Sequence, residues 1–209
     1  MMNKDNKVDA ISVKKPVYVI EFVHRLGLIC WIDNENLMCR KQRGSSEPVH
    51  VKLTRSLKSV EHMAFDWIAL NWYFTDSQNK RIFMCHTTSD QLNGRNETAI
   101  GFCKVIINQH FRSPKSIVVD PNEGYIFYID GAERARIDQA LLDGSGRRTI
   151  VKLNIVRPNG LTLDYANRYI YWLDTYGNHI SRIDYHARRR VEITSGYSVS
   201  IHSEKLMIQ

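Results

Sequence analysis

Residues 157–183, RPNGLTLDYANRYIYWLDTYGNHISRI, decide the fold, because they follow the pattern of three consecutive short strands. The predicted strands are residues 161–164, 169–173 and 179–183. The connections between them, DYAN at 164–167 and DTYGN at 174–178, consist of residue types that form tight turns. This stretch therefore predicts a small antiparallel sheet.

The same pattern occurs twice earlier in the chain, in Pro114–Asp120 with Tyr125–Asp130 and in Val60–Asp66 with residues 72–76. Every copy places one Asp ten residues before a second Asp, and an aromatic pair before the second. The repeat positions are Asp66, Tyr73, Phe74 and Asp76, then Asp120, Phe127, Tyr128 and Asp130, then Asp164, Tyr171, Trp172 and Asp174. The chain is a repeat protein.

The stems YFTD, FYID and YWLD, which end at Asp76, Asp130 and Asp174, resemble the YWTD (class B) repeat of the low-density lipoprotein receptor and its related proteins. Two copies also have a Pro six residues before the first Asp, at Pro114 and Pro158. The resemblance covers roughly residues 17–194. It implies an all-β fold, a YWTD-type β-propeller whose complete ring has six blades.

The spacing of the repeats predicts about four of those six blades, so we expect an incomplete propeller. Trp31 to Phe74 is 43 residues and Tyr128 to Trp172 is 44, which is the period of four-stranded blades. The longer interval between Phe74 and Tyr128 indicates an inserted polar loop at residues 86–99. The expected blades are residues 17–53, 59–108, 112–153 and 156–194, between a disordered polar segment (1–16) and a divergent tail (195–209).

Packing between blades explains the repeated residue types. Both faces of a blade stack on neighbours, so both need bulk, and we expect Trp31, Phe74, Tyr128 and Trp172 to fill the space between blades. The second Asp of each copy is expected to accept N–H groups of the turn that follows it. Four blades form an open arc, which predicts bare aromatic faces around Trp31 at one end and around Tyr171 and Trp172 at the other. The isolated chain is therefore expected to be marginally stable or to self-associate.

Composition favours a globular domain. The chain has 209 residues, 43% of them hydrophobic, and no apolar run long enough to span a bilayer. Residues 1–16 lack the apolar centre of a secretory signal, so we expect a piece of a longer protein. The net charge of +7 comes from scattered basic residues. Their one tight cluster, residues 188–190, is expected to be a solvated turn, and no nucleic-acid partner is predicted.

The cysteines and one sequon favour a secreted origin. Cys30 and Cys39 lie in one predicted blade, and Cys85 and Cys103 in the next, which suggests two local disulfides. The alternative is free buried cysteines in a cytosolic protein. Zinc is disfavoured because there is no Cys-x-x-Cys motif. Asn96 begins the sequence Asn-Glu-Thr inside the inserted loop and is a candidate glycosylation site.

The sequence predicts no enzyme, cofactor or metal. One Asp per blade at one position is a structural signature, whereas a catalytic site uses unlike residues. There is no Gly-x-Ser-x-Gly motif and no phosphate-binding Gly loop. Histidines can act as proton switches, but the spacing singles out none of His62, His110 and His179.

Two functions remain. The resemblance implies a non-catalytic extracellular module of an endocytic, single-pass membrane receptor, for ligand binding or ligand release at the cell surface or in endosomes. Its partners would be protein or lipoprotein ligands, and growth-factor-like (EGF-like) and cysteine-rich modules would flank it in the parent protein. The alternative is a calcium-dependent propeller hydrolase of the lactonase or strictosidine-synthase kind, in which Asn159 and Glu123 or Asp164 would face a common channel. The recurrent aromatic-aromatic-x-Asp stem favours the receptor module.

Overall fold

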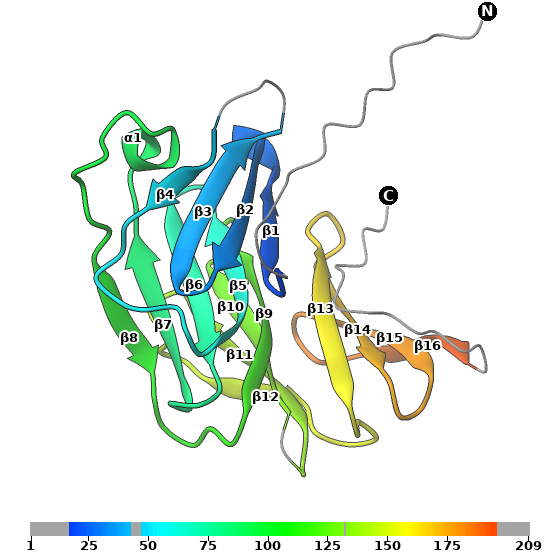
Figure 1. Cartoon of the computed structure of the whole chain (residues 1–209). Helices are drawn as coiled ribbons and strands as arrows, with labels where there is room; N and C mark the ends of the chain where they lie inside the picture. The colour runs from blue at the N-terminus through cyan, green and yellow to red at the C-terminus, as the bar shows by residue number, and fades with distance from the viewer. Residues whose placement is uncertain (1–16, 43–46, 132, 196–209) are drawn as a thin grey trace, which may run out of the picture.

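The computed structural model of the chain describes residues 17–42, 47–131 and 133–195, and it forms four antiparallel sheets of four strands each (Figure 1). Helix in these residues is limited to one 3-10 turn, η1 (His24–Leu26), and one short helix, α1 (Ser89–Leu92). The all-β expectation is thus confirmed. The predicted N-terminal segment, 1–16, and residues 196–209 of the predicted tail lie outside the described residues.

Each sheet is a meander of consecutive strands and constitutes one blade. Blade 1 contains β1 (Ile20–Val23), β2 (Leu28–Asp33), β3 (Asn36–Lys41) and β4 (Val49–Val51). Blade 2 contains β5 (Val60–Asp66), β6 (Asn71–Asp76), β7 (Arg81–His86) and β8 (Cys103–Ile107). Blade 3 contains β9 (Pro114–Asp120), β10 (Tyr125–Asp130), β11 (Arg136–Leu141) and β12 (Arg148–Val151). Blade 4 contains β13 (Pro158–Asp164), β14 (Tyr169–Asp174), β15 (His179–Asp184) and β16 (Arg190–Ser195).

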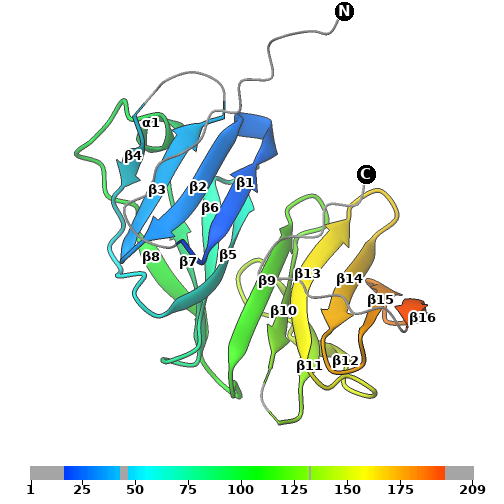
Figure 2. The same ribbon diagram turned by 45° about the vertical axis from the view of Figure 1, so that its right-hand side comes forward.

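The first strand of each blade is the innermost one. β1 contacts β5, β5 contacts β9, and β9 contacts β13, so the four blades follow one another along an arc. Figure 2 shows β9 and β13 side by side at the junction of blades 3 and 4. This is the radial arrangement that the repeat predicts.

The three strands predicted from residues 157–183 are present, and each is longer than expected. β13 begins at Pro158 rather than at residue 161, because a bulge between Asn159 and Leu161 lets the strand continue past Gly160. Gly160 has φ of +67°, which suits glycine at a bulge. β14 and β15 each extend by one residue, to Asp174 and Asp184.

The aromatic pair of each repeat packs on opposite faces of its sheet. Phe74 lies in the hydrophobic cluster between blades 1 and 2, whereas Tyr73 lies in the cluster between blades 2 and 3. In blade 3, Tyr128 faces blade 2 and Phe127 faces blade 4. Alternation of side chains along a strand produces this division. Two adjacent aromatic residues thereby fill two junctions.

The expected bare aromatic faces are absent, which corrects the sequence-based expectation. Trp172 lies in the cluster between blades 3 and 4, because it occupies the position equivalent to Phe74 and Tyr128. Trp31 and Tyr171 are on the outward positions of the first and last blades, yet they are 4% and 7% exposed. Arg182 donates a 3.3 Å hydrogen bond to the Tyr171 hydroxyl.

Hydrogen bonds also cross the junctions. The Leu161 N–H donates to the Ser116 hydroxyl at 3.1 Å between the inner strands β13 and β9. The buried Tyr185 hydroxyl donates to Asp120 Oδ2 at 2.8 Å, and together with burial this raises the pKa of Tyr185. These bonds fix the rotation of blade 4 on blade 3 as well as its distance.

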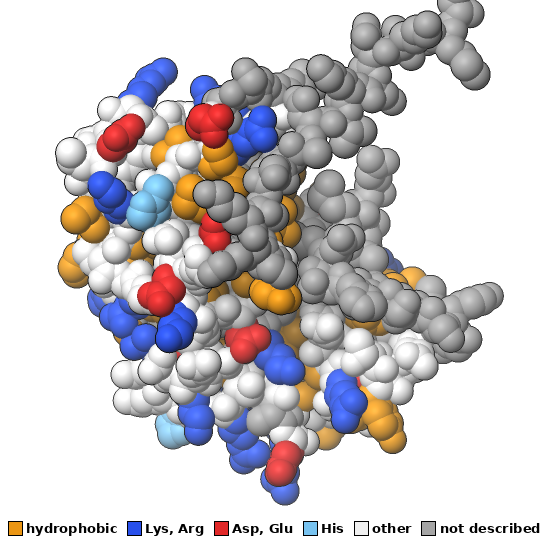
Figure 3. All heavy atoms as spheres, in the orientation of Figure 1, with side chains coloured by type: hydrophobic (Ala, Val, Ile, Leu, Met, Phe, Trp, Pro, Cys, Tyr) orange, Lys and Arg blue, Asp and Glu red, His pale blue; other side chains and the backbone are white. Residues whose placement is uncertain are grey.

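The basic cluster 188–190 is divided between two environments. Arg188 and Arg189 are exposed in the turn before β16, as expected. Arg190 instead lies over the Trp172 ring and donates to the carbonyl oxygens of Leu153 and Asn154, so it joins β16 to the β12–β13 connection. Elsewhere, Lys and Arg side chains are interspersed with Asp and Glu on the face shown in Figure 3.

The inserted loop connects β7 to β8 and contains α1. Thr88 caps this helix with Gln91 in a reciprocal capping box, and the Gln91 amide also donates to the Ala99 carbonyl at 3.0 Å. In the described part of the chain, no helix has the length and apolar character needed to cross a membrane.

Candidate functional site

The first Asp of each repeat caps the turn that follows its own strand. Asp66 Oδ1 accepts the N–H groups of Ile68 and Ala69 at 2.8 and 3.0 Å. Asp120 does the same for its hairpin turn, and Asp164 accepts both the backbone and side-chain N–H of Asn167. These carboxylates shape the β-turns.

The second Asp of each repeat has a broader role than expected. Asp174 accepts N–H groups of the following turn, from Tyr176, and also those of Val156 and Arg157 in the preceding connection. Asp130 likewise accepts the N–H groups of Arg112 and Ser113 in the connection from the preceding blade, and it forms a 3.1 Å ion pair with Arg136. The connection passes beside the end of the second strand, so the carboxylate can tie it to the blade.

Asp76 ends the second strand of blade 2 and binds groups of the turn that follows that strand. It accepts from the backbone and side chain of Asn79 and forms a 2.8 Å ion pair with Arg81. Burial by itself would raise the pKa of the carboxyls of Asp76 and Asp174, but the hydrogen bonds they accept outweigh it, so both pKa values are lowered. These are ionised structural carboxylates.

The residues that a metal-dependent hydrolase would need do not converge. Glu123 forms a 2.8 Å ion pair with Arg168, and Asp164 is engaged by Asn167. Asn159 is at the opposite end of β13 from Asp164, roughly 16 Å away at the usual rise per residue. Among the described residues, no group of three or more His, Cys, Asp and Glu side chains is placed to hold a metal ion.

The three histidines considered from the sequence occupy separate places. His62 Nδ1 is 3.4 Å from the Ile117 N–H across the junction of blades 2 and 3. The His110 carbonyl accepts from Arg136, and His179 Nε2 is 3.5 Å from the Arg190 guanidinium. They form no common cluster with a nucleophile.

The structure joins all four cysteines in the two pairs suggested by the sequence. Cys30 and Cys39 are direct partners across β2 and β3, and Cys85 and Cys103 are direct partners across β7 and β8. The register, which the sequence did not determine, therefore allows both bonds. Cys30 takes the stem position that an aromatic residue has in the other blades.

Asn96 is exposed in the inserted loop between α1 and β8. Its side-chain oxygen accepts a hydrogen bond from the Thr98 hydroxyl and another from the Ala99 N–H, both at 3.0 Å. The side-chain amide nitrogen of this sequon lies on the surface in a defined turn.

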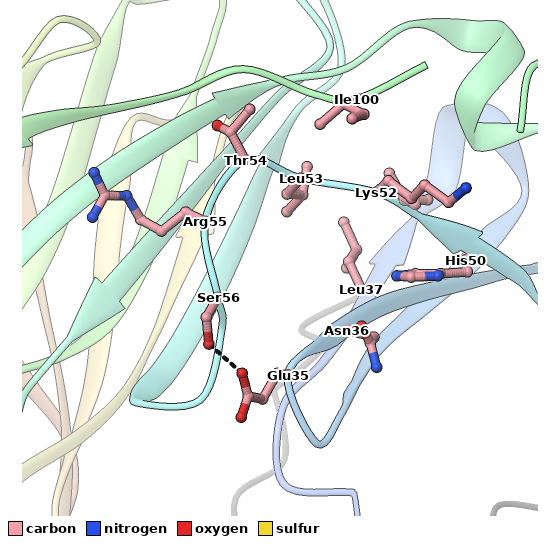
Figure 4. A pocket seen from close by; sticks show the side chains of 11 residues that line it. Glu35, Asn36, Leu37, His50, Lys52, Leu53, Thr54, Arg55, Ser56 and Ile100 are labelled. Carbon is pink, nitrogen blue, oxygen red and sulfur yellow. Dashed lines mark hydrogen bonds between the residues drawn. The ribbon is translucent and has the colours of Figure 1, made fainter. Parts of the chain in front are cut away.

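A pocket of about 360 Å³ lies at the outer edge of blades 1 and 2 (Figure 4). The Leu37, Leu53 and Ile100 side chains border a shared space in that view, and Glu35 accepts a 2.6 Å hydrogen bond from Ser56. His50, Lys52 and Arg55 add basic groups to the lining. We call this site the edge pocket.

Sequence reasoning missed the edge pocket because its two walls are 48 residues apart in the chain. A parallel bridge joins Leu53 to Gly101, and a Cβ at Gly101 would lie 2.7 Å from the His86 carbonyl oxygen. A glycine between the two apolar residues Ile100 and Phe102 was the available signal for a close backbone approach.

Comparison with known proteins agrees with the repeat geometry. Residues 124–165, which include β10, β11, β12 and β13, match the family model for the low-density lipoprotein receptor repeat class B. The chain is 33% identical over 143 residues to the vitellogenin receptor Yl of Drosophila melanogaster. The chain contains a low-density lipoprotein receptor repeat of class B, at residues 124–165. The aligned region is 68% of this chain and 7% of the Drosophila receptor.

Two further matches bear on these class B (YWTD) repeats. The human low-density lipoprotein receptor-related protein 5-like protein is 24% identical over 166 residues, which cover 78% of the chain and 61% of that protein. The solved nidogen/laminin complex contains a chain with a TM-score of 0.70 and 23% identity, covering 83% of this chain and 63% of that one. The chain thus spans less than two thirds of the length of these relatives, and the structural match supports the propeller fold.

Proposed function

We propose that this chain is a non-catalytic, extracellular module of an endocytic lipoprotein-receptor-like protein, and that it serves ligand binding or ligand release. The observation that carries the proposal is the 33% identity to a vitellogenin receptor over 68% of the chain. The engagement of the repeat aspartates in turns and connections supports a non-catalytic role, because those carboxylates are committed to structure.

The proposed partners are protein or lipoprotein ligands. The structurally similar chain in the nidogen/laminin complex also belongs to an assembly of proteins. In the parent protein we expect flanking growth-factor-like and cysteine-rich modules and a single membrane-spanning segment, with this chain on the outer or endosomal side. Two disulfides support an oxidising compartment.

Full-length transcript sequencing tests the receptor assignment. We expect cysteine-rich modules on at least one side of the class B repeats, and an apolar segment of about 20 residues beyond them. A complete reading frame without either feature would contradict the proposal.

Direct binding tests the ligand role. The chain is immobilised, and purified vitellogenin and low-density lipoprotein are passed over it at pH 7.4 and pH 5.5, with serum albumin as the control. We expect saturable binding of at least one of the two particles and a different affinity at the two pH values. Binding equal to that of albumin at both pH values would count against a ligand-contacting module.

We also propose that Asn96 carries an N-glycan. Its exposure and its turn geometry support this, as does the secretory origin suggested by the disulfides. Material secreted from animal cells is expected to lose mass on treatment with an N-glycosidase. The variants Asn96→Gln and Thr98→Ala should both migrate at the deglycosylated position, and unchanged migration of either would refute the site.

A further inference from the structure

Blade 4 has exposed apolar side chains at the end where the chain enters it from blade 3. In the connection from β12 to β13, Leu153 is 71% exposed and Val156 is 51% exposed. In the turn from β14 to β15, Tyr176 is 69% exposed. Basic side chains occur in the same connection. The blade 4 patch is defined here as the side chains of Lys152, Leu153, Val156, Arg157 and Tyr176.

Hydrogen bonds hold the two segments of the blade 4 patch against each other. Asp174, at the end of β14, accepts the N–H groups of Val156 at 2.7 Å and of Arg157 at 3.1 Å. Thr175, the next residue, donates its N–H and its hydroxyl to the Arg157 carbonyl, at 3.0 and 3.1 Å. The backbone of the patch is therefore fixed before a partner arrives, which lowers the entropy cost of binding.

The repeat itself does not require apolar residues at these positions. Val156 is two residues before its inner strand, and the same position is Lys58 in blade 2 and Arg112 in blade 3. Tyr176 is two residues after the second repeat Asp, where blade 2 has Gln78 and blade 3 has an alanine. Since other blades form with polar or small residues there, packing of the fold does not explain the exposed apolar side chains. Contact with a partner does.

The exposed charges of the patch are basic. Lys152 and Arg157 are both exposed, and the Arg190 guanidinium is held beside the connection by two of its carbonyl oxygens. The one carboxylate in the two segments, Asp174, is 1% exposed and is bonded to backbone N–H groups. The exposed Glu192 is on β16, outside both segments. A partner surface with carboxylates at its edge is therefore complementary to the patch.

We propose that the blade 4 patch binds a partner protein whose contact surface combines apolar side chains with Asp or Glu. Val156 and Tyr176 supply the apolar contact, and Arg157 pairs with a carboxylate. Tyrosine and arginine are enriched in the energetically important part of protein interfaces. The fixed backbone favours a protein over a lipid surface, because a fluid bilayer has no fixed shape to match. The proposal goes beyond the receptor function and does not depend on it.

A peptide library tests the patch without a known ligand. A phage-displayed library of random disulfide-closed peptides is selected on the immobilised 209-residue chain, and the enriched peptides are synthesised and titrated by fluorescence polarisation. The library contains acidic, basic and apolar sequences alike, so the chain itself selects the chemistry. We expect the enriched peptides to combine aliphatic or aromatic residues with an excess of Asp and Glu over Lys and Arg.

Two variants and two matched controls locate the binding. Tyr176→Ser should weaken the peptides roughly tenfold, as loss of an important interface aromatic does. Arg157→Glu should weaken them roughly fivefold, because a surface ion pair is lost. The controls are Phe102→Ser, which changes a residue 70% exposed in blade 2, and Arg188→Glu, an exposed position at the opposite end of β15 from Tyr176. Both should leave the affinity unchanged at physiological salt, which screens distant charges.

All four substitutions are at exposed positions, so thermal melting is expected to show that each variant folds. Peptides whose affinity Tyr176→Ser and Arg157→Glu leave unchanged would place the contact elsewhere and overturn the proposal. A selection that enriches no peptide, or peptides without an acidic excess, would do the same. So would sedimentation of the chain with phosphatidylserine vesicles that Tyr176→Ser abolishes, because the patch would then be a lipid contact.

Discussion

At the scale of single residues, the aspartate that ends the second strand of a blade concentrates several structural tasks in one side chain. In blade 4, the carboxylate of Asp174 accepts N–H groups from Val156, Arg157 and Tyr176, and it is 1% exposed. Charge-assisted hydrogen bonds of this kind are stronger than neutral ones. The connection between two blades and the next hairpin therefore share one anchor.

Replacement of Asp174 by Asn should lower the stability of the fold, although the two side chains have the same shape. In Asp174→Asn an N–H₂ group is forced toward backbone N–H donors and the charge is lost, so we expect a loss of about 3 kcal/mol in the free energy of unfolding. Urea denaturation measures it. The control is Asp143→Asn, because Asp143 caps an exposed turn at Ser145 and its replacement should cost much less. Equal losses in the two variants would show that Asp174 is not an anchor.

Acid should destabilise the chain through the same carboxyls. The folded-state pKa values of Asp76 and Asp174 are lowered, so their contribution is complete above the unfolded value of about 4 and is lost as pH falls through the folded values. We expect these two groups to leave stability unchanged from pH 7 to 5.5 and to reduce it below about pH 4.

The measurement is the urea midpoint at a series of pH values from 7 to 2.5. Asp174→Asn should show a shallower decline below pH 4 than the unsubstituted chain, since one linked carboxyl is gone. A decline of the same steepness in both chains would assign the acid response to other groups.

For single residues, the sequence predicted which positions repeat more accurately than it predicted the hydrogen-bond partners of those residues. The position of every repeat Asp and aromatic residue follows from the spacing alone. The partners of Asp130 in the preceding connection do not, and neither does the Tyr185–Asp120 bond, because those contacts depend on how one blade is rotated on the next.

At the scale of elements, blades 3 and 4 are each closed by contacts between the outer strand and the connection that leads into the blade. Arg147, just before β12, donates to the Gln109 carbonyl at 2.6 Å and lies over the Phe111 ring. Arg190, at the start of β16, makes the equivalent contacts with the β12–β13 connection and Trp172. A long cation suits this role because its stem packs on an aromatic ring while its donors reach carbonyl oxygens.

The strands themselves were predictable because turn residues and the Asp spacing define both ends of most of them. The start of β13 was placed three residues late, since a bulge at Gly160 interrupts the pattern without ending the strand. The helix α1 also escaped the sequence reading, although Thr88 and Gln91 form the spacing of a capping box. Short elements inside an insertion have too few periodic residues to detect.

The disulfide between β7 and β8 should stabilise the outer half of blade 2. It closes a segment with a sequence separation of 18 residues, for which the expected contribution is about 3 kcal/mol in the chain-entropy model. Non-reducing peptide mapping of secreted material should recover Cys85 linked to Cys103. The double variant Cys85→Ala/Cys103→Ala should have a lower urea midpoint, and its free energy of unfolding should be smaller by about that contribution.

The comparison is the bond between β2 and β3, which has a sequence separation of only 9 residues, so Cys30→Ala/Cys39→Ala should cost slightly less. Recovery of Cys85 and Cys103 as free thiols from secreted material would refute the assignment to an oxidising compartment.

At the scale of the whole molecule, stability comes from three junctions rather than from one central core. One hydrophobic cluster joins blades 1 and 2, a second joins blades 2 and 3, and a third joins blades 3 and 4. A blade has no interior of its own, because at each of these junctions its face is buried against the neighbouring blade. Since Trp31, Tyr171 and Trp172 are buried, self-association of the 209-residue chain remains a prediction from its open sheet edges alone.

Removal of one blade should therefore also lower the stability of the blades that remain, because it uncovers a face of the neighbouring blade. A chain ending at residue 153 lacks blade 4 and uncovers the face of blade 3 that carries Val118, Phe127, Ile129, Ile137 and Ile150. It also removes the donor to Asp120. At about 1.5–3 kcal/mol for each large apolar side chain, the loss is comparable with the total stability of a domain.

We expect residues 1–153 to self-associate and to unfold at a markedly lower temperature than residues 1–209, measured by sedimentation velocity and by calorimetry at the same concentrations. Residues 1–195 are the control, because that truncation keeps β16 and all of the third cluster. The junction model requires the 1–195 chain to behave as the 209-residue chain does, since the contacts between blades 3 and 4 are intact. If residues 1–153 instead remained monomeric with an unchanged transition, blade 4 would be an independent unit, and the stability of the first three blades would not depend on stacking at that face.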